Sequence, residues 1–314
     1  MTNGPSGFAA GARAPLPGRV LVTGADGKIG RAVVEALTGL GVRITALSMS
    51  WAAPSQADRV VTGDATAESD VAEALDGADA VVHLAAIAHR DLARPYDVYR
   101  TNTGATFNVL TQAATGGQIG RAVIASSINA FGVPMNHHAV STAYYPIDED
   151  VPVQLDDWYS LSKYSDELTA GMVASHWGLP VVALRFPHVN AWHELRVFAE
   201  RAGREPGNAQ LVREGWSYLD LRDAVGAVVA ALTAPVSGSL VVGVSARDTL
   251  IDADSGELLD AYAPDVPRRR SITGRGSLID TTRASTALGF TPRYSVHVPS
   301  DAPEPAPTTA GVTP

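Results

Sequence analysis

The chain has 314 residues, a formal net charge of −9 and no cysteine. This length suits one large domain or two small ones with a sizeable apolar core. The negative charge argues against nucleic acid or an anionic membrane surface as the main partner. The absence of cysteine excludes disulfides and thiolate chemistry, and it fits a reducing compartment.

Both ends of the chain have the composition of disordered tails. Residues 1–18 are rich in Gly, Ala and Pro, and their longest apolar run is too short for a secretory signal. Residues 299–314 are mostly Pro, Ala and Thr with acidic residues. No run of about 18 apolar residues occurs, so we predict no membrane span.

The first folded stretch combines a short apolar strand at residues 20–22, a glycine-rich loop and the start of a helix. Glycines at positions 24, 27 and 30 allow backbone N–H groups to approach a pyrophosphate, and the positive end of the helix dipole points to the same place. The spacing alone arises by chance in many proteins. Its position between a strand and a helix makes it a predicted dinucleotide site.

Strands and helices alternate up to about residue 186. Further strands are predicted at residues 42–47, 59–62, 80–86, 121–127 and 181–185. Further helices are predicted at residues 67–76, 95–115 and 158–177. This alternation indicates βαβ units in one parallel sheet, and ligands of such sheets bind beyond the carboxyl ends of the strands.

The pattern is looser after residue 186. We predict helices at residues 191–202, 222–234, 254–262 and 281–288, and strands at residues 210–213, 218–221 and 239–244. Residues 187–216 and 246–298 are assigned to a small cap. Residues 217–245 are expected to return to the domain that begins at residue 19.

Tyr159 and Lys163 are four residues apart, so they share one face of the predicted helix 158–177. A phenol, with a pKa of about 10, is a poor base near neutral pH, but a neighbouring ammonium favours the phenolate. Such a phenol can exchange a proton with a substrate hydroxyl, and Ser127 at the end of a strand can bind the same oxygen. In an arbitrary protein these would more often be surface residues. Only two of the 24 basic residues are lysines, Lys28 and Lys163, and this scarcity favours a specific role.

Motifs spread over residues 19–292 resemble those of the extended short-chain dehydrogenase/reductases, the NAD-dependent epimerase/dehydratase family. They are Thr23-Gly24-x-x-Gly27-x-x-Gly30, Gly63-Asp64, His83-Leu84-Ala85-Ala86, Asn102 ahead of Thr106, Ser126-Ser127, Tyr159-x-x-x-Lys163, Leu184-Arg185-Phe186-Pro187 and Leu288-Gly289-Phe290-Thr291-Pro292. Each piece alone is weak, but the combination in this order is specific.

The resemblance implies an α/β fold, a Rossmann-type doubly wound parallel sheet with a small C-terminal substrate-binding cap. It implies a triad of Ser127, Tyr159 and Lys163. It places Asp64 and Ala65 at the adenine, and Asn102 in support of the lysine. The cofactor-binding residues that it implies are Gly24, Gly27, Lys28, Ile29, Gly30, Ser48, Asp64, Ala65, Leu84, Ala85, Ala86, Asn102, Tyr159, Lys163, Phe186 and His188.

The cofactor is predicted to be NAD, with NADP as the alternative. Ser48 stands where NAD-preferring members of that family carry an acid, which would bind the ribose 2′-hydroxyl and repel a 2′-phosphate. No arginine closely follows Ser48, so no phosphate clamp replaces the acid.

The substrate is predicted to be small. Residues 127–130 lack the acidic pair of the family's dehydratases, which argues against elimination. His188 and Trp216 stand where nucleotide-sugar members carry an asparagine and an arginine that help to hold a diphosphate. A sugar-like or polar alcohol substrate, as in the similar uronate dehydrogenases, fits better. Its candidate contacts, each as often a packing residue, are Ser127, Asn129, His188 and Trp192.

We therefore predict a cytoplasmic NAD(P)-dependent oxidoreductase with a small-molecule substrate and no nucleic-acid or membrane partner. A nucleotide-sugar 4-epimerase is the first alternative. A non-catalytic NAD(P)-binding sensor is the second, although the presence of both Tyr159 and Lys163 argues against it. A homodimer through the helices at residues 95–115 and 158–177 is expected. No metal is predicted, because no acid has ligand spacing from His137 and His138.

Overall fold

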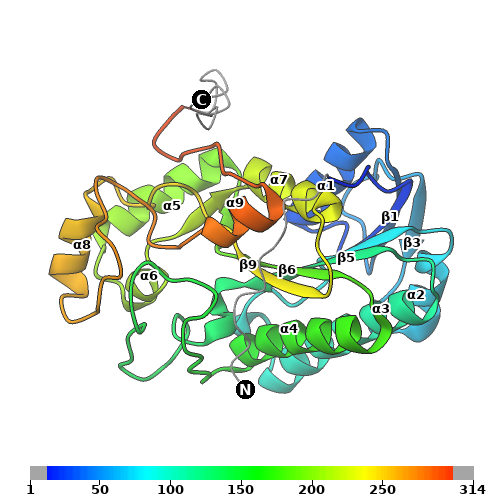
Figure 1. Ribbon diagram of the computed structural model, residues 1–314, viewed down its shortest axis with the longest axis horizontal. Helices are drawn as coiled ribbons and strands as arrows, with labels where there is room; N and C mark the ends of the chain where they lie inside the picture. The colour runs from blue at the N-terminus through cyan, green and yellow to red at the C-terminus, as the bar shows by residue number, and fades with distance from the viewer. Residues whose placement is uncertain (1–12, 300–314) are drawn as a thin grey trace, which may run out of the picture.

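The computed structural model describes residues 13–299. Seven parallel strands form its main sheet in the order β3-β2-β1-β4-β5-β6-β9 (Figure 1). The strands are β1 (Arg19–Thr23), β2 (Arg43–Ser48), β3 (Arg59–Thr62), β4 (Ala80–His83), β5 (Arg121–Ser127), β6 (Val181–Phe186) and β9 (Ser239–Gly243). The predicted α/β class and doubly wound parallel sheet are confirmed.

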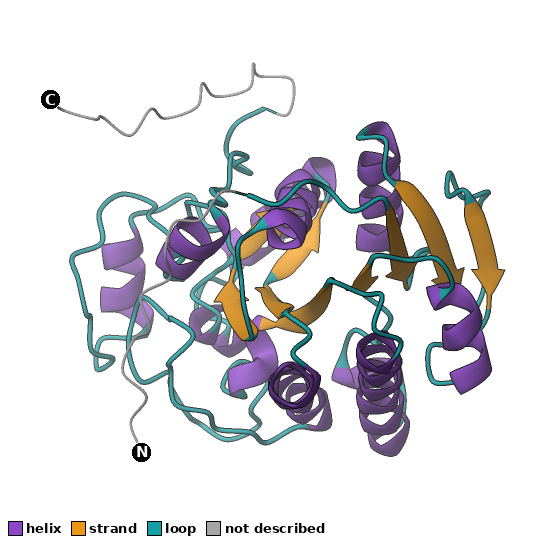
Figure 2. Ribbon diagram, turned by 45° about the vertical axis from the view of Figure 1, so that its right-hand side comes forward, coloured by secondary structure: helices purple, strands orange, loops and turns teal. Residues whose placement is uncertain are grey.

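Helices cover both faces of this sheet (Figure 2). Helices α3 (Pro95–Thr115) and α4 (Trp158–Trp177) pack side by side on one face, next to α2 (Glu68–Leu75). The other face carries α1 (Lys28–Gly39), α7 (Leu221–Thr233) and α9 (Thr282–Leu288). All residues of β4 and β6 are buried, because helices cover both faces of the sheet at these central strands.

The strand order places a binding crevice at the end of β1. The chain moves from β1 to β2 and β3 in one direction, then returns to place β4 on the other side of β1. Such a reversal leaves an opening between the connections at the carboxyl ends of the strands.

The cap has its own small sheet and its own core. Strands β7 (His188–Asn190) and β8 (Tyr218–Asp220) pair in parallel, beside α5 (Trp192–Arg204), α6 (Ala209–Arg213) and α8 (Ser255–Tyr262). Its core includes Tyr145, Trp216 and Tyr218. Two short 3₁₀ helices, η1 (Arg90–Leu92) and η2 (Ile128–Phe131), were not predicted.

The predicted strand at residues 210–213 is wrong, because these residues form α6. Asn208 Oδ1 accepts hydrogen bonds from the N–H groups of Gln210 and Leu211 at 3.1 and 3.3 Å and so caps a helix start. The segment that begins at Tyr218 also differs from expectation. It pairs with β7, whereas β9 pairs with β6 in the main sheet and α7 packs against α1.

Residues 13–18, which we assigned to an N-terminal tail, pack against the domain instead. Arg13 donates to the carbonyl oxygen of Leu288 at 2.9 Å, and the Ala14 N–H donates to that of Thr233 at 2.8 Å. The rest of that predicted tail, and residues 300–314 of the C-terminal one, lie outside the described residues. Between residues 13 and 299, no helix is long and apolar enough to cross a membrane.

Candidate active site

The glycine-rich loop lies against the end of β4 at a distance that only glycine allows. A Cβ atom on Gly24, where φ is +64°, would lie 2.7 Å from the Ala85 backbone nitrogen. A Cβ on Gly30 would lie 2.2 Å from the Gly24 carbonyl oxygen. Within the described part of the chain, no side chain caps the start of α1, and its first turn holds no acid. Its free N–H groups at residues 28–30 therefore fit a pyrophosphate.

The adenosine end of the predicted site lies beside the last residue of β2, Ser48. A pocket of about 180 Å³ opens here, lined by Asp26, Arg31 and Trp51 among others. Asp26 accepts from the Ala52 N–H at 3.0 Å and pairs with Arg31 at 2.8 Å. We did not predict a role for Asp26, although its position inside the glycine motif was a visible signal. Its carboxylate lies close to the end of β2, where Ser48 provides no charge.

The loop after β3, with the predicted adenine contacts Asp64 and Ala65, is held by hydrogen bonds. Asp64 Oδ1 accepts from the Thr66 N–H at 2.8 Å, and the Ala65 carbonyl accepts from Asn108 at 2.9 Å. This loop therefore lies at the carboxyl edge of the sheet, as the glycine-rich loop does.

The end of β4 is tied to β1 through a buried histidine. Thr23 Oγ1 contacts His83 Nδ1 at 2.7 Å and accepts from the N–H groups of Leu84 and Ala85 at 3.3 Å each. His83 Nε2 contacts Thr106 Oγ1 at 3.2 Å. Burial, helped by the charge of Lys163, lowers the pKa of His83 to about 3. The neutral imidazole therefore holds Thr23 Oγ1 where it accepts from Leu84 and Ala85, at the place where the cofactor is expected.

Asn102 connects the loop after β4 to helix α4. Its Oδ1 accepts from the Ile87 N–H at 2.7 Å, while its Nδ2 donates to the Ile87 carbonyl at 3.1 Å and to Ser162 Oγ at 3.0 Å. Ser162 directly precedes Lys163. The geometry therefore agrees with a supporting role beside the lysine.

Tyr159 and Lys163 are both buried, with exposed fractions of 6% and 5%. Asp157 caps α4 by accepting from the N–H groups of Tyr159 and Ser160 at 2.9 Å each, and this cap fixes the first turn. The structure thus contradicts the alternative that the pair consists of solvated surface residues.

The ammonium of Lys163 points toward the end of β5. It donates to the Ala125 carbonyl at 3.0 Å and to Asp166 Oδ2 at 3.2 Å. Burial works against its charge, but Asp166 and then Tyr159 outweigh burial and raise the pKa of Lys163. Asp166, itself buried, was missed in the sequence because an acid three residues after a lysine is common on helix surfaces.

Ser127 ends β5 and has both acceptor positions of its hydroxyl filled. Its Oγ accepts from the backbone N–H and from Nδ2 of Asn129, each at 3.1 Å. The hydroxyl proton of Ser127 therefore remains free to donate to a ligand. Asn129 Oδ1 is buried and has no hydrogen-bond partner among the described residues.

The remaining predicted contacts lie where the cap meets the sheet. Phe186 is buried at the end of β6. His188 stacks on Phe198 with centroids 4.3 Å apart, and burial, aided by the charge of Lys28, lowers its pKa. Trp192 donates its indole N–H to the Val298 carbonyl at 2.7 Å.

Lys28 bridges the glycine-rich loop and the cap. Its ammonium lies 2.8 Å from Glu194 on α5 and also donates to Asn190 on β7. About two fifths of both charged side chains is exposed, at 45% and 40%.

The side chains of Arg185 and Trp216 both make contacts within the protein and are not placed to hold a diphosphate. Arg185 makes a buried bidentate ion pair with Glu167, with both N···O distances at 2.8 Å. Trp216 is fully buried in the cap core and donates to the Pro206 carbonyl at 2.8 Å.

A glycine-rich, uncapped helix start at the reversal point of a parallel sheet, with a buried tyrosine and lysine at the same edge, is typical of dinucleotide-dependent oxidoreductases. The chain belongs to the NAD dependent epimerase/dehydratase family, whose family model matches residues 20–243. This membership confirms the resemblance stated from the motifs, and with it the predicted cofactor NAD.

Proteins that are similar in sequence include a dehydrogenase, a reductase and a UDP-glucose 4-epimerase. The chain is 32% identical over 203 residues to an L-arabinose 1-dehydrogenase (NAD(P)(+)) of Haloferax volcanii, covering 63% of this chain and 76% of the relative. It is 28% identical over 314 aligned residues to a 3-diazoavenalumate denitrifying reductase of a Streptomyces species, covering 88% of this chain and 96% of the relative.

Among solved structures, the fold is similar to that of a short-chain dehydrogenase/reductase superfamily protein of Agrobacterium tumefaciens with bound NAD. The TM-score is 0.66 at 23% identity, over 88% of this chain and 93% of the other. At this identity the likeness supports the fold.

Proposed function

We propose that this protein is an NAD(P)-dependent dehydrogenase or reductase that moves hydride to or from a carbinol or carbonyl carbon of a small sugar-like or polar alcohol substrate, as uronate dehydrogenases do. The observation that carries this proposal is the burial of Tyr159 and Lys163 on one face of α4, beside the end of β5 that holds Ser127. A tyrosine and a lysine without a function would more often lie on the solvent-exposed face of the helix.

The chain's own residues divide the proton chemistry between them. Bound NAD supplies the acceptor for the hydride. The ammonium of Lys163 favours the phenolate form of Tyr159. This phenolate takes the proton of the substrate hydroxyl and becomes the neutral phenol. Ser127 donates its free hydroxyl proton to the same substrate oxygen and so orients it.

Asn129 favours a substrate with several hydroxyl groups. Its buried Oδ1 lacks a donor among the described residues, and an unpaired buried acceptor costs about 1–3 kcal/mol. A substrate hydroxyl next to the reacting carbon would satisfy this oxygen. His188 and Trp192 are proposed as further contacts from the cap.

A nucleotide-sugar epimerase fits less well. Arg185 is held by Glu167, and Trp216 lies in the cap core, so neither is placed to hold a diphosphate. An epimerase would purify with tightly held cofactor and give no net reduction of NAD. Net reduction with a free sugar supports the dehydrogenase instead.

The test follows the absorbance of the reduced nicotinamide with aldoses, uronates and simple ketones or alcohols, using NAD and NADP in parallel. On the best substrate, Tyr159→Phe is expected to lower kcat by about 10²–10⁴-fold, because a general acid–base group is lost. The matched control is Tyr99→Phe, whose hydroxyl on α3 contacts only Ser165 Oγ at 3.3 Å among the described residues. Full turnover by Tyr159→Phe would contradict the assigned role.

We also propose a homodimer through α3 and α4. Support comes from large apolar side chains that lie exposed on these two adjacent helices, among them Tyr96, Phe107, Leu161, Leu168 and Met172. In light scattering, Leu168→Glu is expected to yield monomers, whereas Val197→Glu on α5, where Val197 is also exposed, leaves the dimer intact. A monomeric wild type would rule out this arrangement.

A further inference from the structure

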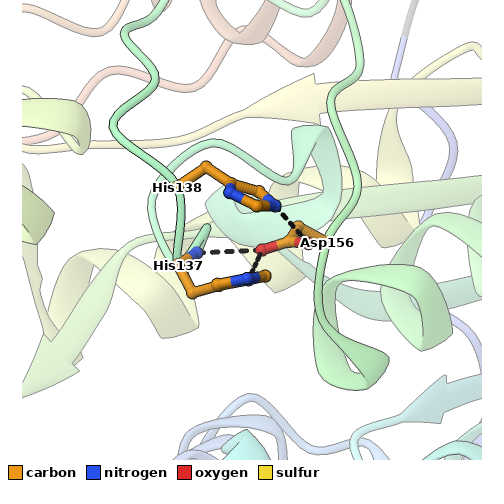
Figure 3. A group of neighbouring side chains, drawn as sticks. All are labelled: His137, His138 and Asp156. Atoms are coloured by element: carbon orange, nitrogen blue, oxygen red, sulfur yellow. Dashed lines mark hydrogen bonds and ion pairs between the residues drawn. The ribbon is translucent and has the colours of Figure 1, made fainter.

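Two adjacent histidines lie close to an aspartate that follows much later in the sequence, just before the start of α4. His137 and His138 lie in the segment between η2 and α4, and both rings face Asp156 (Figure 3). His137 contacts Asp156 Oδ2 through both its backbone N–H, at 2.9 Å, and its Nδ1. His138 Nε2 lies 3.8 Å from Asp156 Oδ1. No acid has ligand spacing from the histidine pair in the sequence, but chain folding brings Asp156 to it.

The two imidazole rings lie together although both are exposed. His137 and His138 are in a bend of the chain, and their rings lie on one side with centroids 3.9 Å apart. About two thirds of each imidazole is exposed, at 67% and 66%, so apolar burial does not hold them together. A shared ligand is a physical reason for two hydrated rings to meet over one carboxylate.

The chemistry of the three groups matches a borderline transition-metal ion. Imidazole nitrogen and carboxylate oxygen are ligands of Zn²⁺, whereas Mg²⁺ and Ca²⁺ prefer oxygen alone. The three ligand atoms already lie within 4.8 Å of one another. Bonds of about 2.0–2.2 Å in tetrahedral geometry place ligand atoms roughly 3.3 Å apart. Rotation of the side chains would therefore have to separate His137 Nδ1 from the Asp156 carboxylate and bring His138 Nε2 slightly closer to it.

The backbone beneath the histidines is fixed by its own hydrogen bonds. Arg213 from α6 donates to the carbonyl oxygens of Asn136 and His138, each at 2.7 Å. The Asn136 side chain accepts from the His138 N–H at 2.9 Å and donates to the Gln154 carbonyl at 3.1 Å. Such outer contacts orient metal ligands and reduce the cost of ordering them.

We propose that His137 Nδ1, His138 Nε2 and the Asp156 carboxylate bind one Zn²⁺ ion, with water in the remaining position. The ion joins the loop that carries the histidines to the residue that precedes the Asp157 cap of α4. The same loop carries Met135, which packs against Tyr159. Zinc thus fastens one wall of the candidate active site, and its binding does not depend on the proposed reaction.

The test measures zinc binding by untagged, chelator-treated full-length protein in equilibrium dialysis. The wild type is expected to bind one Zn²⁺ per chain and no Mg²⁺, and to show a rise in Tm that grows with zinc concentration. His137→Ala, His138→Ala and Asp156→Asn are each expected to weaken binding by more than about tenfold, since loss of outer contacts alone costs that much. Without metal, the two histidine variants should keep the wild-type Tm, because about two thirds of each imidazole is exposed.

The matched control is His176→Ala, which removes another exposed histidine, in the last turn of α4. It is expected to bind zinc as the wild type does. Replacing zinc with Co²⁺ should give the visible absorption of a four-coordinate site in the wild type. It should not do so in the triple variant that combines His137→Ala, His138→Ala and Asp156→Asn. No zinc binding by the wild type at several-fold excess, or equal binding by the wild type and the triple variant, would overturn the proposal.

Discussion

The parallel sheet and the cap bury different kinds of side chain. The core on one face of the sheet consists mostly of aliphatic residues from strands and helices, such as Val20, Val82 and Val228. The cap core is built around large aromatic residues whose polar ends are satisfied by distant partners. Tyr218 donates to Asp248 at 2.5 Å and accepts from the Val296 N–H at 2.8 Å.

The two cores are therefore stabilised by different interactions. Aliphatic packing in the sheet is independent of pH and spread over many contacts. The cap instead depends on a few buried groups that need specific hydrogen bonds, and one of them, Glu214, can change charge. Substitutions in the cap core should therefore be more sensitive to pH than substitutions in the aliphatic core of the sheet.

The largest effect on stability is expected from Trp216→Ala. Removing this fully buried indole from the cap core should lower the free energy of unfolding by about 3–5 kcal/mol, measured by urea denaturation. The matched control is Trp177→Ala at the end of α4, where the indole is 39% exposed and the loss should be much smaller. Equal losses for the two tryptophans would contradict the assignment of Trp216 to a core.

Glu214→Gln tests the pH dependence of the cap. Burial raises the pKa of Glu214 from 4.5 to about 7, despite a hydrogen bond from Gln210. The folded state therefore binds this proton more tightly than the unfolded state, and stability falls as pH rises from about 4.5 to 7. The neutral variant should be more stable than the wild type at pH 8 by about 3 kcal/mol, with no advantage below pH 4.5.

The measurement is Tm against pH for both proteins. Parallel curves from pH 4 to pH 8 would show that Glu214 does not titrate in this range. Because Asp223 in the main domain has a pKa that burial raises to about 6, some pH dependence should remain in the variant.

Tyr218→Phe removes one hydroxyl from the cap. The Val296 N–H and the Asp248 carboxylate each lose a partner, which should cost about 1–3 kcal/mol. Tyr99→Phe on α3 should be nearly neutral in the same denaturation assay, because that hydroxyl is exposed. A neutral Tyr218→Phe would mean that the cap is held by apolar packing alone.

The smallest expected effect concerns the charge pair in the sheet domain. Asp166 compensates the ammonium of Lys163, which lies 3.2 Å away. In Asp166→Asn the uncompensated ammonium favours the phenolate of Tyr159 more strongly. The acid limb of the pH profile of kcat should move to lower pH by about one unit. An unchanged profile would show that Asp166 has only a structural role.

The sheet domain could be predicted from sequence because its signals are local. Residue ranges for α3, α4 and β5 were predicted to the residue, since apolar runs and caps mark them. The spacing of Tyr159 and Lys163 likewise depends on one helix turn. These signals are readable in the sequence because each lies within a single helix or strand.

The cap and the rest of the site could not be predicted in this way. Residues 210–213 contain an apolar pair typical of a strand, but the Asn208 side chain caps and stabilises a helix there. Asp166 has a helical spacing from Lys163, but that spacing is common on helix surfaces and does not show that the pair is buried. Asp156 meets the histidine pair only because the chain folds back, and no sequence spacing marks that contact.

The central claim is that Ser127 and Tyr159 hold the reacting oxygen of the substrate at the carboxyl edge of the sheet. The most direct measurement is a crystal structure with NAD and a slowly reacting substrate bound. We predict that the reacting oxygen lies within hydrogen-bond distance of both Ser127 Oγ and Tyr159 Oη. A substrate whose reacting oxygen contacts neither hydroxyl would contradict the account.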